Sequence, residues 1–387
     1  MERHYVYLPM LIALAALQAL LLLLLMGRLA GGRTRRPAER PIPEGIDGPP
    51  LTLVIATLNE AARIGPCLDG LRAQGSPVTE ILVVDSGSTD GTRALVEAAA
   101  RLDPRIRLVT DPPLPSGWIG KAWALQHATT LATTPWVLGM DADTQAEPGC
   151  AAAVLAAALR ERFDAVSFAP RFDGQSTAER WLQPALLVTL IYRSGAVGDP
   201  RVTPDRVIAN GQCFLLKREV LLAHGGYEPV RASFAEDVSL VRHLAARGAS
   251  VGFLDGARLY RVRSYRGAGQ MWREWGRSLD LKDATSKARQ FLDTAFVVAA
   301  QGMQLPAAAL VAAAWPSLPP GPARAVLGAS TAGLVVIRWL LLLALAPSYS
   351  RRGLTWWLSP FADPLAALRL VISSARRPTQ WRSRTYG

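Results

Sequence analysis

The fold is decided by the stretch TEILVVDSGSTDGTRALVEAAARL, residues 79–102. Its first half is a short apolar run that predicts a buried strand ending at Asp85. Its second half has a helical pattern, with Thr89 or Asp90 as the expected cap of the helix. A strand followed directly by a helix is the building unit of α/β proteins.

The same unit recurs between residues 51 and 260. Further strands are predicted at residues 51–59, 105–111 and 134–143, and helical patterns at residues 60–75 and 120–132 lie between them. This alternation predicts an α/β fold with a mostly parallel sheet and helices on both faces.

Three polar residues stand where predicted strands end, namely Asn59, Asp85 and Asp141. Ligands of parallel sheets bind beyond the carboxyl ends of the strands. We therefore expect these residues to line one rim of the sheet and to belong to one site.

Membrane association follows from the apolar and basic segments. The chain has 387 residues, 50% of them hydrophobic, and a formal net charge of +12. Residues 8–26 carry no charge and, at about 1.5 Å per residue, approach the ~30 Å hydrocarbon core. An uncleaved anchor is favoured over a secretory signal. Basic residues follow this segment and close the chain, which predicts a membrane partner, no nucleic acid, and a cytoplasmic location from residue 28 onward.

The three cysteines form no pattern typical of disulfides or metal sites, which fits a reducing compartment. From the whole pattern we predict five regions. These are an N-terminal transmembrane anchor (1–30), a basic linker (31–50), a catalytic domain (51–265), an amphipathic interfacial region (266–292) and a C-terminal membrane region (293–387).

The C-terminal region holds two candidate spans, residues 294–315 and 325–346. Arg338 in the second is costly in a membrane unless it is buried against protein. Residues 354–373 contain two prolines, an Asp and an Arg. We favour an interfacial or re-entrant segment there over a further span.

Asp141 and Asp143 are candidate metal ligands. In an extended backbone, residues i and i+2 point to the same side, so the two carboxylates could converge on one ion. Mg²⁺ typically takes one or two carboxylates together with phosphate oxygens. A helix cap is the alternative reading of the same pair.

Two loops suit phosphate groups. Asp85 precedes small residues and a helix start, where backbone N–H groups could face a phosphate or ribose, although an ordinary Asx turn has the same sequence. Lys121 lies beside a Gly-flanked loop that suits a diphosphate, and its alternative is a surface lysine. The spacing is not that of a P-loop.

An acidic pair opens another predicted helix in SFAEDVSLVRHL, residues 233–244. Acidic residues are common helix caps, yet Asp237 at a pocket rim is also what a general base for a hydroxyl requires. Gln270 and Arg273 share one helix face in GQMWREW, residues 269–275, which also carries Trp275. A helix whose basic residues snorkel at a membrane surface explains that segment equally well.

Six motifs, TLNE, VVDSGSTDGT, GWIGK, MDAD, AED and the Gln-Arg-Trp segment, occur in the order seen in family 2 glycosyltransferases. Over residues 50–290 the chain resembles that family, which implies a GT-A fold. The spans around this region resemble the lipid-glycosylating branch, which includes the hopanoid-associated, carotenoid and ceramide glycosyltransferases.

The resemblance implies roles for particular residues. Asp237 would deprotonate the acceptor hydroxyl, and Asp143, with Asp141 beside it, would hold Mg²⁺ or Mn²⁺. The remaining residues expected to bind the nucleotide-sugar are Asn59, Glu60, Asp85, Lys121, Asp141, Gln270, Arg273 and Trp275. Two positions depart from the family pattern: Ser86 stands where a second Asp is common, and Glu274 separates Arg273 from Trp275.

The implied function is an inverting transfer of one sugar from a UDP- or GDP-sugar to a hydroxyl of a lipid. The expected location is a bacterial inner membrane, with the catalytic domain facing the cytoplasm. The main alternative is a polyprenyl-phosphate sugar transferase. A nucleotidyltransferase and a non-catalytic membrane scaffold are further alternatives.

Overall fold

The structure is a computed structural model that describes residues 2–200, 203–263, 265, 267–279, 281–376, 380–381 and 384–385. The chain forms two compact units. The helical unit comprises Met1–Arg33, Gly174–Ala196 and Tyr265–Arg377. The sheet unit comprises Thr34–Asp173, Val197–Ser264 and Pro378–Gly387.

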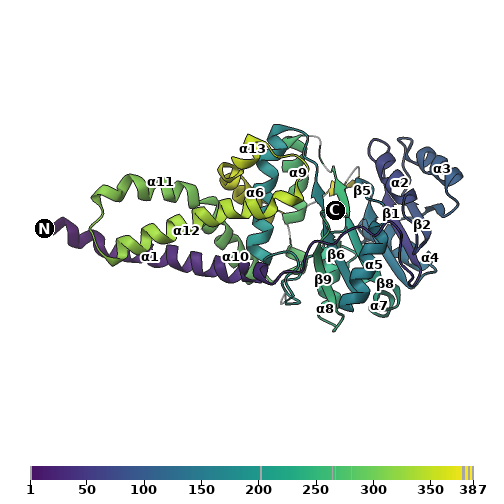
Figure 1. Cartoon of the computed structure of the whole chain (residues 1–387), viewed down its shortest axis with the longest axis horizontal. Helices are drawn as coiled ribbons and strands as arrows, with labels where there is room; N and C mark the ends of the chain where they lie inside the picture. The colour runs from purple at the N-terminus through teal and green to yellow at the C-terminus, as the bar shows by residue number, and fades with distance from the viewer. Residues whose placement is uncertain are drawn as a thin grey trace. The chain divides into compact units, whose positions relative to one another are not determined.

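A seven-stranded sheet forms the centre of the sheet unit, in the order β3-β2-β1-β4-β8-β6-β9 (Figure 1). All its pairings are parallel except those of β8, which runs antiparallel to β4 and β6. The mostly parallel sheet expected from the sequence is therefore confirmed. The strands are β1 (Leu51–Thr57), β2 (Val78–Asp85), β3 (Ile106–Thr110), β4 (Trp136–Asp141), β6 (Ala165–Ala169), β8 (Cys213–Lys217) and β9 (Val251–Asp255).

Two small sheets accompany the central one. The first has the order β5-β10-β7, and the second pairs β11 with β12. Their strands are β5 (Thr144–Ala146), β7 (Arg171–Phe172), β10 (Tyr260–Val262), β11 (Gln380–Trp381) and β12 (Arg384–Thr385).

Helices cover both faces of the central sheet, because successive strand residues point to opposite sides. Leu53 and Ile55 of β1 join an apolar cluster with α2, α3 and α5, whereas Val54 between them joins a cluster with α4. Phe214 and Leu216 of β8 pack with α7 and α8. The helices are α2 (Ile64–Arg72), α3 (Thr92–Leu102), α4 (Gly120–Leu131), α5 (Cys150–Glu161), α7 (Arg218–Ala223) and α8 (Glu236–Ala245).

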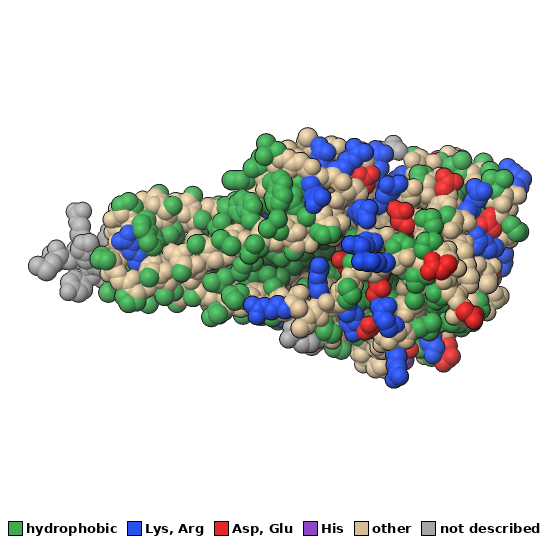
Figure 2. Space-filling view, viewed as in Figure 1, with side chains coloured by type: hydrophobic (Ala, Val, Ile, Leu, Met, Phe, Trp, Pro, Cys, Tyr) green, Lys and Arg blue, Asp and Glu red, His purple; other side chains and the backbone are tan. Residues whose placement is uncertain are grey.

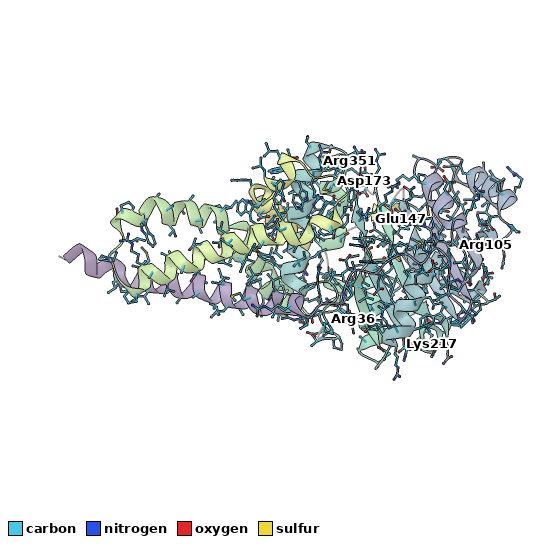
Figure 3. The ribbon with its side chains drawn as sticks, viewed as in Figure 1. Arg36, Arg105, Glu147, Asp173, Lys217 and Arg351 are labelled. Atoms are coloured by element: carbon cyan, nitrogen blue, oxygen red, sulfur yellow. The ribbon has the colours of Figure 1, made fainter. Side chains whose placement is uncertain are left out.

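Part of the predicted linker is bound to the sheet unit as an extended strap. Backbone bonds join Glu39 to Asp255 and Ile42 to Gly149. Arg36, labelled in Figure 3, forms an ion pair with Glu161 at 2.7 Å. Gly149 is required here, because a Cβ at this position would lie 2.2 Å from the carbonyl carbon of Ile42. Glycine and arginine content predicts a linker but does not exclude such docking.

The helical unit holds the apolar helices. Among the residues that the structure describes, two helices are long and apolar enough to cross a membrane, over Leu8–Arg33 and Pro322–Ser348. A third span is possible if the pair Lys287–Gly302 and Gln304–Ser317, bent by 49°, is one span. Figure 2 shows hydrophobic side chains spread over the visible surface of α1 (Glu2–Leu29), α11 (Gln304–Ala314) and α12 (Pro322–Leu345), with few charged ones among them.

The longer helices of this unit are α1 (Glu2–Leu29), α6 (Thr177–Ser194), α9 (Ala268–Leu279), α10 (Lys287–Val297), α11 (Gln304–Ala314), α12 (Pro322–Leu345) and α14 (Asp363–Ala375). Residues 266–292, predicted as one amphipathic region, contain α9, a short turn Lys282–Ala284 and the start of α10. Residues 354–373 form α13 (Leu354–Trp357), the turn Ser359–Ala362 and most of α14. That break includes Pro360, which cannot donate a backbone hydrogen bond.

Arg338 is buried against protein, as the sequence requires. Its Nε lies 2.7 Å from Oδ2 of Asp363 at the start of α14, and its Nη2 donates to Oδ1 of the same carboxylate at 2.9 Å. Gln301 donates to that carboxylate as well, at 3.0 Å. The cost of placing a charge within an apolar helix is thus offset by a two-point ion pair.

Candidate active site

The three polar strand ends lie on one rim of the sheet. Within the register of β1 with its neighbours, Thr57 is paired with Asp85 of β2, and Ala56 is paired with Asp141 of β4. Asn59 follows two residues after Thr57. The register confirms that these residues lie at one rim of the sheet, whereas their sharing of one binding site stays a prediction.

The backbone after Asp141 differs from the prediction. β4 ends at Asp141, and Ala142 and Asp143 form a turn before β5 begins at Thr144. The Thr144 hydroxyl donates to the Asp141 carbonyl at 2.7 Å, which closes this turn. The prediction that an extended backbone points the Asp141 and Asp143 side chains to the same side is therefore wrong. Any convergence of the two depends on the turn.

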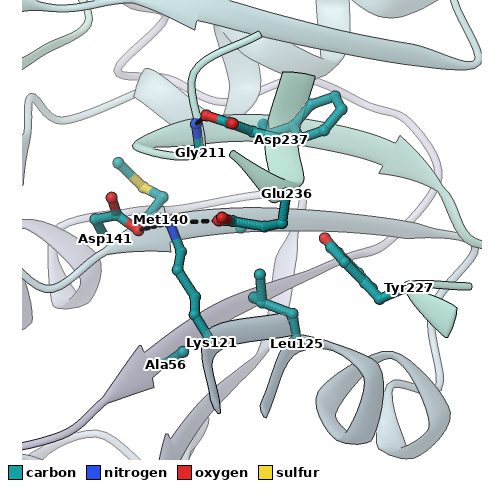
Figure 4. A pocket seen from close by; sticks show the side chains of 11 residues that line it. Ala56, Lys121, Leu125, Met140, Asp141, Gly211, Tyr227, Glu236 and Asp237 are labelled. Atoms are coloured by element: carbon teal, nitrogen blue, oxygen red, sulfur yellow. Dashed lines mark hydrogen bonds and ion pairs between the residues drawn. The ribbon is translucent and has the colours of Figure 1, made fainter. Parts of the chain in front are cut away.

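Lys121 links the rim to a second acidic side chain. Its ammonium lies 2.9 Å from Oδ1 of Asp141 and 2.8 Å from Oε1 of Glu236. Figure 4 shows the side chain between these two carboxylates. Lys121 belongs to the first turn of α4, and Glu236 opens α8. Burial alone lowers the pKa of Lys121. The carboxylates of Asp141, Glu236 and Asp237 outweigh that effect and raise the pKa well above its usual value.

Asp237 lies in the same pocket. Its Oδ2 accepts a hydrogen bond of 2.8 Å from the backbone N–H of Gly211, and its Oδ1 accepts one of 2.8 Å from Val238. Burial, with the neighbouring charge of Glu236, raises the pKa of Asp237 to about 7, although Lys121 opposes this. A carboxylate poised near neutral pH has the property required of a general base.

The pocket is lined from several strands and helices of the sheet unit. Figure 4 shows Tyr227 extending its hydroxyl into it, and burial raises the pKa of this hydroxyl above its usual value. Besides the charged residues, the lining consists of Ala56, Leu125, Gly139, Met140, Gly211, Phe214 and Tyr227.

Asn59, Glu60 and Asp85 each hydrogen-bond to residues 88–92, which form the loop between β2 and α3 and the start of α3. The side-chain oxygen of Asn59 accepts from the backbone of Thr89 at 2.9 Å. The Asp85 side chain is fully buried and accepts from the backbone of Ser88 at 3.1 Å. These bonds make the loop preorganised, but the Asp85 carboxylate itself is enclosed by protein.

Glu60 binds locally as well. Its carboxylate accepts two bonds from Arg63, at 2.9 and 2.7 Å, and its backbone N–H donates to the Thr92 hydroxyl at 2.9 Å. Ser86, at the position where the family commonly has an Asp, donates to the carboxylate of Asp111 at 2.9 Å.

Gln270, Arg273 and Trp275 lie on α9, which belongs to the helical unit. Gln270 donates to Glu274 at 2.8 Å. The Arg273 side chain is exposed, whereas Trp275 is buried, with its ring 5.9 Å from that of Tyr265. Arg273 and Trp275 thus occupy different helix faces, as the extra residue between them predicts. Their contact with a donor stays a prediction.

Sequence reasoning missed the contributions of Glu236, Gly211 and Tyr227. Glu236 stands beside the predicted base, and its position in the first turn of α8 suggests only a helix cap. Its contact with Lys121 joins residues more than a hundred positions apart, which no local pattern reveals. Gly211 carries no side-chain signal at all.

The residues at the end of β4 fit a divalent cation. Asp141 and Asp143 supply oxygen ligands, which Mg²⁺ and Mn²⁺ prefer. Within the described residues, no group of three or more His, Cys, Asp or Glu side chains could hold a metal ion. Two carboxylates fit a site completed by ligand phosphates, as is usual for Mg²⁺.

Comparison with known proteins gives a family match for part of the chain. Residues 52–225 match the family described as Glycosyl transferase family 2. The lipopolysaccharide core biosynthesis glycosyltransferase LpsC of Rhizobium meliloti (strain 1021) is 39% identical over 94 residues, which cover 24% of this chain and 32% of that protein. The succinoglycan biosynthesis protein ExoA of the same strain is 28% identical over 210 residues, covering 52% and 60%. The chain thus spans less than two thirds of either relative.

A solved structure supports the fold. The mannosyltransferase PcManGT from Pyrobaculum calidifontis aligns with 94% of this chain and 99% of its own, at a TM-score of 0.57 and 23% identity. Residues 52–225 therefore match glycosyltransferase family 2, and the fold is of the GT-A type.

Proposed function

We propose that the protein is an inverting, membrane-bound glycosyltransferase that moves one sugar from a nucleotide-sugar to a hydroxyl of a lipid. The observation that carries this proposal is the pocket shared by Asp237, Lys121 and Asp141 within a family 2 glycosyltransferase domain. The pocket combines the Asp237 carboxylate, whose pKa is about 7, with the Lys121 ammonium, which is held at the carboxyl ends of the strands.

In the reaction, Asp237 acts on the acceptor and Lys121 acts on the leaving group. Asp237 takes the proton of the acceptor hydroxyl, whose oxygen then forms a bond to the anomeric carbon of the sugar. The bond from that carbon to the diphosphate oxygen breaks, and the nucleoside diphosphate leaves with the electron pair. Lys121 offsets the negative charge that develops on the leaving group. Attack opposite the leaving group inverts the anomeric centre.

The donor is a UDP- or GDP-sugar. PcManGT was solved with GDP-mannose and Mn²⁺, which supports this class of donor and cation. Asp143 and Asp141 would hold Mn²⁺ or Mg²⁺, and a bound cation would neutralise charge on the diphosphate. Asn59, Glu60 and Asp85 act on the nucleotide through the loop that they hold, because the Asp85 side chain is enclosed.

The acceptor is a membrane lipid of the carotenoid, hopanoid or sphingolipid type. Support comes from the candidate spans and from exposed apolar side chains among residues 354–375. Leu354, Phe361 and Leu368 are 75%, 57% and 50% exposed. Exposed apolar side chains of this size suit a lipid surface better than water. The segment lies in the interface and does not cross the membrane.

The proposed topology places the sheet unit on the cytoplasmic side. The basic residues after α1 and the exposed pair Arg351 and Arg352 after α12 then share one side, as the positive-inside rule requires. Buried Arg338 is compatible with a span because Asp363 neutralises it. On this topology the catalytic domain faces the inner surface of a bacterial plasma membrane.

The experiment that tests the function follows release of nucleoside diphosphate by the full chain in detergent with Mn²⁺. UDP-glucose, UDP-galactose and GDP-mannose serve as donors, with and without a total lipid extract. Release that depends on the extract is expected. Asp237→Asn should lose that release, whereas Asp69→Asn, a matched change at a 77% exposed side chain, should retain it.

The products separate the alternatives. A sugar attached to a neutral lipid supports the proposal, whereas a polyprenyl-phosphate-linked sugar selects the alternative transferase. Formation of a new nucleotide-sugar from a sugar phosphate would indicate a nucleotidyltransferase. Absence of both turnover and donor binding would support the alternative of a non-catalytic membrane scaffold.

A further inference from the structure

We propose that Glu236 is a positioning residue for sugar transfer, which holds the Lys121 ammonium at the end of β4 so that it can receive an anionic group of the donor. This inference rests on the proposed function and assigns a role to a residue beside the expected base. Glu236 acts through Lys121 and does not itself touch the reacting atoms.

The geometry places the Lys121 ammonium between two carboxylates. Oε1 of Glu236 lies 2.8 Å and Oδ1 of Asp141 lies 2.9 Å from Nζ. Glu236 is 6% exposed and the Lys121 side chain 15% exposed, so solvent screens the pair only weakly. A lysine side chain has many rotamers, and two opposed partners remove most of that freedom.

One hydrogen of the ammonium remains for a ligand. A protonated lysine has three N–H donors. Among the described residues, the ammonium forms close ion pairs with Asp141 and Glu236 only. The third donor can therefore serve a phosphate oxygen of the donor.

Gly211 lies against the Lys121 ammonium and beside both carboxylates of the pair Glu236 and Asp237. A Cβ at Gly211 would lie 2.8 Å from Nζ of Lys121, 3.5 Å from Oε1 of Glu236 and 3.6 Å from Oδ2 of Asp237. The backbone of Gly211 also donates to Asp237 at 2.8 Å. The same short segment therefore fits against both the cation and the base.

Without the Glu236 charge, two carboxylates would compete for Lys121. Asp141 is already bound to it, and Asp237 lies close enough for its charge to act on the ammonium. A shift of the ammonium toward Asp237 would remove the cation from the donor side. It would also form an ion pair with the carboxylate that is needed as the base. Glu236 thus keeps the two functions of the pocket apart.

A double-mutant cycle tests whether Glu236 acts through Lys121. The full chain in detergent is assayed with UDP-glucose and GDP-mannose as Glu236→Gln, Lys121→Met and the double variant. Glu236→Gln should raise the donor KM about tenfold or more, in line with other residues that position a binding group. In the Lys121→Met background the same change should have almost no further effect.

The matched control is Glu228→Gln, which removes a carboxylate 3.6 Å from Arg231 at a 66% exposed site and should behave as wild type. Thermal unfolding of each variant establishes that it is folded. If Glu236→Gln does not fold, Glu236→Asp replaces it in the double-mutant cycle. This change withdraws the carboxylate by one methylene, and its effect on the donor KM should likewise disappear in the Lys121→Met background. If the two substitutions instead have independent, multiplicative effects on the donor KM of an active enzyme, the inference is wrong. Absence of turnover in the wild type would instead refute the proposed function.

Discussion

The pH dependence of transfer is the prediction that the structure makes most specific. The pKa of Asp237 is raised from an ordinary 3.8 to about 7 by burial and by Glu236. Asp237 must be deprotonated to act as a base, so activity should fall as pH falls through 7. Roughly nine tenths of the enzyme is active at pH 8 and roughly one tenth at pH 6, a change of about tenfold.

The assay measures kcat/KM for the donor between pH 5.5 and pH 9, because this parameter reports groups of the free enzyme. Wild type should show an acidic limb with a midpoint near pH 7. Asp237→Asn should be slower by about 10²–10⁴-fold and lack this limb, with donor binding retained. Asp69→Asn, at an exposed carboxylate, should preserve the wild-type profile.

An acidic limb near pH 4 would contradict this prediction, because it would show an aspartate with an ordinary pKa acting as the base. The same limb in Asp237→Asn would assign the titration to a different group. Thermal unfolding measured across the pH range separates loss of catalysis from loss of structure.

Three further changes have defined outcomes. Asp143→Ala should abolish the Mn²⁺-dependent binding of GDP and UDP in calorimetry, and unchanged binding would remove Asp143 from the metal site. Gly211→Ala should raise the donor KM with little change in melting temperature, because the added Cβ would lie 2.8 Å from Nζ at the movable end of the Lys121 side chain. Wild-type kinetics in this variant would contradict the prediction. Arg338→Met should lower stability by roughly 3–5 kcal/mol, because it leaves Asp363 buried without its cation. A variant as thermostable in detergent as wild type would show that the pair contributes little.

The arrangement of the rim could be predicted from the sequence because it depends on local patterns. Each of Asn59, Asp85 and Asp141 follows an apolar run, and parallel strands bring such ends to the same edge. The helices on both faces follow from strands that are apolar on both sides, as Leu53 and Val54 illustrate. The family motifs pointed to the same domain that residues 52–225 match.

The details that escaped prediction depend on tertiary contacts. The turn at Ala142 and Asp143 is closed by a hydrogen bond from Thr144, and the extended pattern before it gave no sign of that turn. Docking of the strap requires Gly149 beneath Ile42, which lies far away in the sequence.

The partner of Lys121 was also hidden from the sequence. A first-turn acid such as Glu236 favours a helix cap by local reasoning. Its ion pair with Lys121 depends on how α8 and α4 approach the end of β4. Burial of Arg338, by contrast, could be predicted, because a charge within an apolar span requires a partner.

The central claim, sugar transfer to a membrane lipid, is tested most directly by following the sugar itself. Membranes containing the wild-type chain are incubated with Mn²⁺ and a donor carrying ¹³C-labelled sugar, and extracted lipids are analysed by mass spectrometry and NMR. We expect one labelled sugar on a hydroxyl-bearing lipid, with inverted anomeric configuration, and no such lipid with Asp237→Asn. Absence of labelled lipid while nucleoside diphosphate is still released, or retention of configuration, would contradict this expectation.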